Sequence, residues 1–514
     1  VGSTVDGNTA SGDDADQGGG GVFNDGGTLT IDSTSITNNI ADGVSGSGGG
    51  ILNLGSMTIT DSTISGNVAN RAGGGIEATD ASSTSLTDVS LDGNNVGVSP
   101  AVAAPGNGGG LHVTGSGTVT ISGGTVNNNV AASEGGGLWN GTGVMTVTGT
   151  TISGNTASGD GDDNGGGGLF NVGGTLNVTD STITENVADG VSGSGGGILN
   201  QGTLTVSGGE ISDNAANRAG GGIEATAGTS TTLTDVLMEL NVAGPDGSAA
   251  PGNGGALHIS GDGNADISGG TIRDNSAARE GGGLWNNTGT MTVDGTILTG
   301  NVASGDAADD GGGAIFNNGG TLTVSNATFS GNAADGVLGS GGAIFSTDGA
   351  VTISSTQIGG AIPSEGNTAN RAGGGIEVID GTVTLNFGTD VSNNFAGING
   401  GGLHSTGAAD VTSNLSIFGS NTAATEGGGL WNSSTGTMTI NGGAISSNVA
   451  SGDDASNGGG GLFNDGGTLN IIDAVIGFNV ADGASGSGGG ILNDGGTLTI
   501  SGNTNISNNT ANRA

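Results

Sequence analysis

The chain repeats one short unit along its whole length. The phrase "SGSGGGILN" occurs at residues 45–53, 192–200 and 485–493, and it begins a unit of about 29 residues. Each unit continues through Asn into an alternating segment such as Met57–Thr60 and closes on a step such as Ile64–Asn67. A unit this small cannot bury its own apolar face, so neighbouring units must stack to form a core. The repeat therefore predicts a solenoid.

Counting the Gly run with its apolar pair gives about seventeen to eighteen units. The apolar pair begins at Val22, Ile51, Ile76, Leu111, Leu138, Leu169, Ile198, Ile223, Leu257, Leu284, Ile315, Ile344, Ile376, Leu403, Leu430, Leu462 and Ile491. A longer period overlies the short one, because acidic phrases such as "SGDDADQGGGG" begin at Ser11, Ser158, Ser304 and Ser451, 146 or 147 residues apart. We expect residues 1–514 to form one continuous solenoid of five-coil blocks, approximately 11–157, 158–303, 304–450 and a partial 451–514.

Each unit contains three short apolar stretches with period-two alternation, which indicates three strands per coil. Pairing of equivalent strands in parallel predicts an all-β, right-handed parallel β-helix. In the segment 27–31, alternation sends Leu29 and Ile31 into the bore and the threonines to solvent. We expect corner asparagines to stack as a hydrogen-bonded ladder; they are Asn24, Asn53, Asn140, Asn171, Asn200, Asn286, Asn317, Asn432, Asn464 and Asn493.

Composition excludes several other classes. The 514 residues include 119 Gly but only five Pro and no Cys, and they lack a Gly-X-Y period, which argues against collagen and a disulfide scaffold. The net charge of -41 disfavours nucleic acid and anionic lipid as partners. No apolar run approaches the ~20 residues of a membrane span.

Two recurring steps carry a family resemblance. The Gly-Gly-(Ala/Gly)-apolar step and the apolar-x-x-Asn step, as in Phe329–Asn332 followed by Gly341–Ile344, resemble the repeats of bacterial polymorphic outer-membrane proteins and related autotransporter passengers. The resemblance covers the whole chain. It implies a secreted or surface-displayed adhesin or structural passenger, with a cell-surface or glycan ligand. Phenylalanine in the Asn step is mostly replaced by Ile, Leu or Val.

We expect no enzymatic activity, with a β-helix carbohydrate-active enzyme as an alternative. Catalytic clusters on such folds are unique along the chain, whereas nearly every polar feature here is repeated. Glu77, Glu224 and Glu377 each follow an "NRA" Arg by six positions and are candidate ion-pair partners. The three His residues, His112, His258 and His404, are expected at the surface or at corners. The three Trp residues are expected as large plugs or lateral contacts, or as platforms for sugars.

The acidic loops are candidate metal sites. Several carboxylates in one Gly-rich loop offer the hard oxygen ligands that Ca²⁺ takes in sets of six to eight. The candidate ligands are Asp13, Asp14, Asp16, Asp160, Asp162, Asp163, Asp306, Asp309, Asp310, Asp453 and Asp454. Their spacing matches neither the EF-hand nor the calcium-binding nonapeptide repeat, so solvated turns are the alternative. No other cofactor is expected.

Thr-x-Thr pairs, such as Thr28 with Thr30 and Thr118 with Thr120, recur on one expected face. They resemble the threonine arrays of β-helical antifreeze proteins, which makes ice binding a further alternative. The first expectation is an extracellular structural protein, a subunit or segment of a surface filament that associates head to tail or laterally. A surface adhesin or stalk is the nearest alternative. Because neither end of the sequence has a cap, we expect either a segment of a longer chain or ends that stack on neighbours.

Overall fold

A computed structural model describes residues 2–97, 105–245 and 251–513. It contains two compact units, Val1–Asn264 and Ala265–Ala514, and each is nearly all β. Among the described residues the one helix is a single 3₁₀ turn, Pro363–Glu365. The described part of the chain therefore offers no long apolar helix of the kind that spans a bilayer.

Each coil has four strands, as in β7(Ile51–Asn53), β8(Ser56–Thr60), β9(Thr63–Ser65) and β10(Val68–Ala69). We call these the first-, second-, third- and fourth-series strands. The prediction of three strands per coil is corrected to four. The fourth strand has only two residues and follows the Asn of the closing step directly, so in the sequence it merges with the third apolar stretch.

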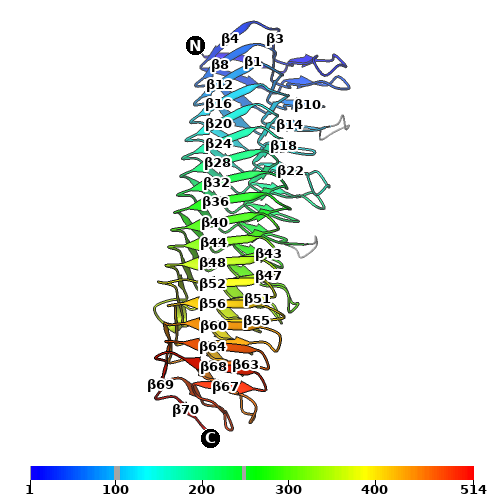
Figure 1. Ribbon diagram of the computed structural model, residues 1–514. Helices are drawn as coiled ribbons and strands as arrows, with labels where there is room; N and C mark the ends of the chain where they lie inside the picture. The colour runs from blue at the N-terminus through cyan, green and yellow to red at the C-terminus, as the bar shows by residue number, and fades with distance from the viewer. Residues whose placement is uncertain (1, 98–104, 246–250, 514) are drawn as a thin grey trace. The chain divides into compact units, whose positions relative to one another are not determined.

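In each unit equivalent strands of consecutive coils pair in parallel, which confirms the parallel β-solenoid, and the described residues contain about 17 coils. In the first unit β7 lies between β3(Val22–Asn24) and β11(Ile76–Ala78), and Ile51 is in register with Val22 and Ile76. Figure 1 shows this stacking for the second-series strands from β4(Thr28–Asp32) to β32(Ser230–Thr234), coloured blue to green. In the second unit the same pattern runs from β39(Leu284–Asn286) to β70(Thr510–Ala511).

The inward positions of all four series form the core. In one coil Ile51, Ile59 and Ile64 are fully buried, as is Ala69 of the short fourth strand. The outward residues of the second-series strand, Ser56 and Thr58, are exposed, as period-two alternation predicts. Each coil therefore buries its apolar side chains only by contact with its neighbours.

The glycine run has a steric cause. Gly48 adopts φ +64°, and a Cβ atom there would lie 2.3 Å from the carbonyl oxygen of Ile51. At Gly49 a Cβ atom would lie 2.4 Å from the carbonyl oxygen of Val68. Any side chain at either position would force the loop away from the strands beside it. The recurring phrase is thus the tight loop that leads from a fourth-series strand into the next first-series strand.

The closing asparagines of the coils form a buried ladder between the third and fourth series. Asn155 donates through Nδ2 to the Oδ1 atom of Asn186 at 2.8 Å and to the carbonyl oxygen of Val126 at 2.8 Å. Its own Oδ1 atom accepts from the backbone N–H and the Nδ2 of Asn129, both at 2.9 Å. The pattern runs from Asn8 to Asn241 in the first unit and from Asn275 to Asn509 in the second. Each amide inside the ladder satisfies its hydrogen-bonding capacity through the adjacent coils.

The predicted corner ladder is also present, but it is interrupted. Asn140 donates to Asn171 at 2.7 Å, and Asn171 donates to Asn200 at 2.8 Å. The preceding coil has Val113 at this register position, so the buried Oδ1 atom of Asn140 accepts no hydrogen bond within the described residues. The closing-step ladder is therefore the more continuous of the two.

Candidate functional site

The middle residues of the first-series strands form a second buried layer. In three consecutive registers these residues are Glu77, His112 and Trp139, followed by Phe170. Alternation points them away from the bore, and the loops that lead into the strands cover them. The rings of His112 and Trp139 stack with centroids 4.2 Å apart, and those of Trp139 and Phe170 lie 6.2 Å apart. In the second unit His404, Trp431 and Phe463 repeat this stack, at 4.4 and 6.1 Å.

Glu77 is the centre of a polar cluster in this layer. Its side chain is 1% exposed, and its Oε2 atom lies 2.7 Å from Nδ1 of His112. The hydroxyl of Thr114 donates to Oε1 at 2.6 Å, and Arg71 lies 3.9 Å from the same atom. Arg71 also donates to the hydroxyl of Ser47 at 3.1 Å. The cluster joins loops and strands of successive coils.

The cluster recurs in each complete block. Arg218 lies 3.9 Å from Glu224, and Arg371 lies 3.7 Å from Glu377, which confirms the predicted Arg–Glu pairs. His258 and His404 contact these carboxylates at 2.7 and 2.8 Å. The expectation that the three His residues lie at the surface or at corners was wrong: all three are 2–3% exposed. Each His occupies the middle position of a first-series strand, where a neighbouring loop covers its side chain. The strand can be recognised from the sequence, but the loop that buries the side chain cannot.

Trp285 and Trp431 are 6% and 9% exposed, and Trp139 is partly buried. Trp139 and Trp431 each stack against a His and a Phe ring, and Trp285 stacks on Phe316, which fits the expected role of large plugs. The ring faces that a sugar platform would need on Trp139 and Trp431 are taken up by these neighbours.

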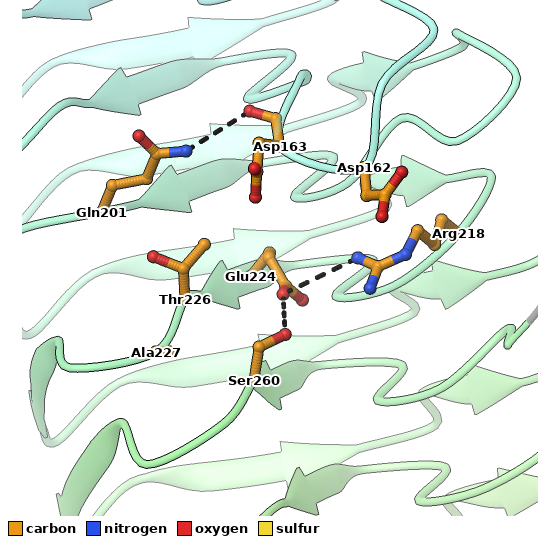
Figure 2. Close-up of a pocket in the computed structure, with 8 residues that line it drawn as sticks. All are labelled: Asp162, Asp163, Gln201, Arg218, Glu224, Thr226, Ala227 and Ser260. Atoms are coloured by element: carbon orange, nitrogen blue, oxygen red, sulfur yellow. Dashed lines mark hydrogen bonds and ion pairs between the residues drawn. The ribbon is translucent and has the colours of Figure 1, made fainter.

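An open cavity of about 450 Å³ lies beside the cluster of the second block (Figure 2). Figure 2 shows Ser260 and Arg218 reaching the carboxylate of Glu224 from two sides, with Asp162 and Asp163 on the facing loop. Ser260 donates to Glu224 at 2.7 Å, and its hydroxyl lies 3.5 Å from Nδ1 of His258. The Ser260 hydroxyl and the His258 ring therefore both face the carboxylate of Glu224. A serine nucleophile is instead activated by a relay in which the hydroxyl contacts His and His contacts the acid. The contacts of Glu224 serve to hold neighbouring loops and strands together.

A second series of carboxylates lies in the covering loops. Glu134 accepts from Nε1 of Trp139 at 3.0 Å, from Asn107 at 2.9 Å and from Asn164 at 2.7 Å. In the second unit Glu280 accepts from Trp285 at 2.9 Å, and Glu426 accepts from Trp431 at 3.1 Å. These carboxylates fasten the loops over the Trp side chains. The constant five-residue spacing from Glu to Trp is the signal in the sequence that could have identified these pairs.

Burial changes the acidity of two of these groups. Desolvation raises the pKa of Glu280 to about 7, against a lowering by the Trp285 N–H and by Arg279. The carboxyl of Asp310, which is hydrogen-bonded to Glu280, raises it further. Asp310 itself accepts from Nε of Arg279 at 2.9 Å. Desolvation also raises the pKa of Glu426.

The structure places the acidic loops between fourth- and first-series strands, and in Figure 1 loops of this kind project from the first-unit stack. The first Asp of each loop binds the next coil's loop by accepting a backbone N–H. These bonds are Val44 to Asp13, Val191 to Asp160, Val337 to Asp306 and Ala484 to Asp453, at 2.8–2.9 Å. Asp14 accepts from Gln17 at 3.1 Å. Asp310 is 3% exposed, whereas the other candidate ligands are exposed, namely Asp13, Asp14, Asp16, Asp160, Asp162, Asp163, Asp306, Asp309, Asp453 and Asp454.

Within the part of the chain that the structure describes, no three His, Cys, Asp or Glu side chains are grouped to hold a metal ion. Calcium binding by the acidic loops stays a prediction from the sequence. The contacts of the first Asp in each loop give these carboxylates a role in joining loops.

The second-series strands of the first unit present a hydroxyl-bearing sheet, which we call the hydroxyl face. Its outward positions in β4 to β32 are Thr or Ser, except for Asp32, Val144 and Asn177. The register aligns Thr30 with Thr58 and Thr120 with Thr146, which confirms that the Thr-x-Thr pairs share one face. Parallel pairing spaces these columns by ~4.8 Å between coils and roughly 6.7 Å along a strand. One charged side chain lies among these positions in a chain of net charge -41.

No family model, curated protein or solved structure matches the chain. The function is therefore argued from the geometry above.

Proposed function

We propose that this chain is an extracellular structural protein, a subunit or segment of a surface filament. The closing-step Asn ladder carries the proposal. In each coil it places a buried amide whose partners belong to adjacent coils, so the ladder serves cohesion between coils. Buried polar groups that are fully satisfied make a structure specific and costly to open.

The remaining buried polar groups support the same role. The carboxylates of Glu77 and Glu134 join successive loops and strands, and Asp160 ties its loop to the next. These contacts recur with the five-coil block, so they strengthen the solenoid in every complete block. The sequence resemblance to polymorphic outer-membrane repeats supports the surface location. The same resemblance makes a surface adhesin the alternative function.

Immunogold labelling of intact and permeabilised cells of the source organism tests the proposal. Antibodies against the whole chain are expected to label intact cells along extended surface structures. Label that appears only after permeabilisation would contradict an extracellular role. Label confined to points of contact with other cells or surfaces would favour the adhesin.

We propose ice binding as a second candidate function, because the hydroxyl face is a nearly uncharged, regular array of Thr and Ser on an acidic chain. A freezing-point assay tests it. We expect the unmodified protein to show thermal hysteresis and Thr120→Tyr to abolish it. Thr151→Tyr should preserve the hysteresis, because Thr151 lies on a third-series strand outside the hydroxyl face. The absence of hysteresis in the unmodified protein would refute ice binding.

A further inference from the structure

One corner of the second unit is apolar and exposed. It lies at the turn between second- and third-series strands and consists of Phe387, Leu415, Ile417, Ile472 and Val475, which we call the apolar corner. Phe387 is 72% exposed, Leu415 55%, Val475 47% and Ile417 44%, and Ile472 is partly buried. Exposed apolar clusters of this kind mark interaction sites on soluble proteins.

The apolar corner spans consecutive coils. Ile417 of β57(Ile417–Gly419) is in register with Ala444, and Ala444 is in register with Val475 of β65(Val475–Gly477). The backbone N–H of Leu415 donates to the carbonyl oxygen of Asn441 at 2.9 Å. The N–H of Gly442 donates to the carbonyl oxygen of Ile472 at 2.7 Å. The residues of the apolar corner therefore lie at the same turn of neighbouring coils, with the small residues Gly442 and Ala444 in the coil between Leu415 and Ile472.

The solenoid does not require apolar residues here, because the first two blocks have polar residues or Gly at equivalent positions. Gly123 corresponds to Leu415, and Thr125 corresponds to Ile417. Thr179 corresponds to Ile472, and Thr182 corresponds to Val475. Phe387 is an insertion, since one residue, Asp88, stands where Phe387 and Gly388 stand in the third block. The apolar corner is thus an addition to the repeat.

The backbone supports the same conclusion. Leu415 adopts φ +59°, a left-handed conformation that costs a branched side chain free energy and that other coils fill with Gly, Asp, Asn or Ser. Its Cδ2 atom would lie 2.6 Å from a Cβ atom at Gly442, so the Leu415 side chain covers that glycine. A groove of about 330 Å³ follows, lined by Leu415, Asn441, Gly442, Ile472 and Asp473.

The charges around the apolar corner identify the chemistry of its occupant. Asp473 is exposed and lines the groove, and Asp390 is in register with Ile417. The sequence has no Lys or Arg between Arg371 and Arg513, so this stretch supplies no basic group to balance them. A second copy of the chain would bring the same carboxylates to the contact, and like charges oppose it. We propose that the apolar corner is a docking surface for a basic amphipathic segment of a partner protein.

Peptide binding to the full chain tests this assignment. Three labelled synthetic peptides serve as probes: alternating Leu and Lys, alternating Ser and Lys, and alternating Leu and Glu. The test variant Leu415→Gly/Ile472→Thr/Val475→Thr installs the residues that stand at equivalent positions in the first two blocks, so the fold tolerates them. Ile297→Thr is the matched control, because Ile297 is 45% exposed on a third-series strand outside the apolar corner.

Binding is measured by fluorescence anisotropy at physiological ionic strength. We expect the affinity of the Leu–Lys peptide for the unmodified chain to exceed its affinity for the test variant on the order of tenfold. The Ile297→Thr control should bind like the unmodified chain, and the Ser–Lys peptide should not distinguish the two. Equal binding of the Leu–Lys peptide to chain and variant would overturn the proposal, because charge alone would then explain it. If the Leu–Glu peptide bound the unmodified chain as tightly as the Leu–Lys peptide or more tightly, the proposal of a basic partner would be overturned. Self-association in sedimentation that the variant abolishes would assign the apolar corner to a second copy instead.

Discussion

The Nδ1 atom of His112 lies 2.7 Å from the Oε2 atom of Glu77, and this buried contact joins two consecutive first-series strands. Both side chains are almost completely shielded from water. Removing one member of such a pair leaves the other buried without its partner.

Glu77→Ala is therefore expected to destabilise the coils around it by roughly 3 kcal/mol. Amide hydrogen exchange should accelerate in the loop of Arg71 and in β15(Leu111–Val113). Glu210→Ala, on a partly exposed third-series strand position, serves as the control and should change stability by less than about 0.5 kcal/mol. Equal effects of the two changes would show that the cluster does not hold the coils.

The closing-step Asn ladder makes a second prediction. Asn155→Ala removes an amide whose four hydrogen bonds all run to adjacent coils, and it leaves their buried partners unsatisfied. We expect a loss of roughly 2–4 kcal/mol and a lower thermal midpoint by calorimetry. Asn177→Ala, on the hydroxyl face, is the matched control and should leave the midpoint nearly unchanged.

The raised pKa of Glu280 predicts that the free energy of unfolding depends on pH. Its pKa is raised in the folded state from 4.5 to about 7, so the folded form binds a proton more tightly than the unfolded form does. Its contribution to stability is fully present below about pH 4.5 and is lost as the pH rises through about 7. The thermal midpoint of the unmodified chain, relative to that of Glu280→Gln, should fall across this window. A constant difference between the two proteins would contradict the burial of this carboxyl.

The contact of Asp160 with the next coil predicts how fast a loop amide exchanges its hydrogen. Its carboxylate accepts the backbone N–H of Val191 at 2.9 Å. Asp160→Ala should increase the hydrogen-exchange rate of that amide several-fold, in line with the net value of about 1 kcal/mol for one hydrogen bond. Asp162→Ala, a change at an exposed neighbour in the same loop, should leave the rate unchanged.

Calcium binding by the same loops is tested separately. Calorimetric titration of Ca²⁺ into the chelator-treated full chain should give a saturable heat if the loops supply oxygen ligands. The heat should fall in a variant that combines Asp160→Asn with Asp162→Asn and Asp163→Asn. No heat in the unmodified chain would remove the prediction.

Much of the fold could be predicted, because solenoid repeats make each local pattern appear many times. The alternation in the second-series strands placed Thr28 outward, and the six-residue spacing identified Arg71 and Glu77 as partners. The fourth strand was missed because Val68 and Ala69 form a strand too short to show alternation. His112 was misplaced because the covering loop that buries it is adjacent in space and not along the strand.

The apolar corner could not be predicted from repeats alone, since it is a departure from them. Leu415 and Val475 are 60 residues apart in the sequence, and stacking of their coils brings them to one corner. A comparison of each block with the first, position by position, would have shown both as apolar replacements.

Electron microscopy of the protein isolated from its native source tests the central claim most directly. A structural role predicts long, uniform fibres whose diffraction shows a ~4.8 Å repeat along the fibre axis, the spacing of stacked parallel strands. Fibres that disperse on addition of a chelator would further assign the acidic loops to calcium-mediated assembly. Discrete particles without fibres, in preparations where the protein is intact, would contradict a filament-forming structural protein.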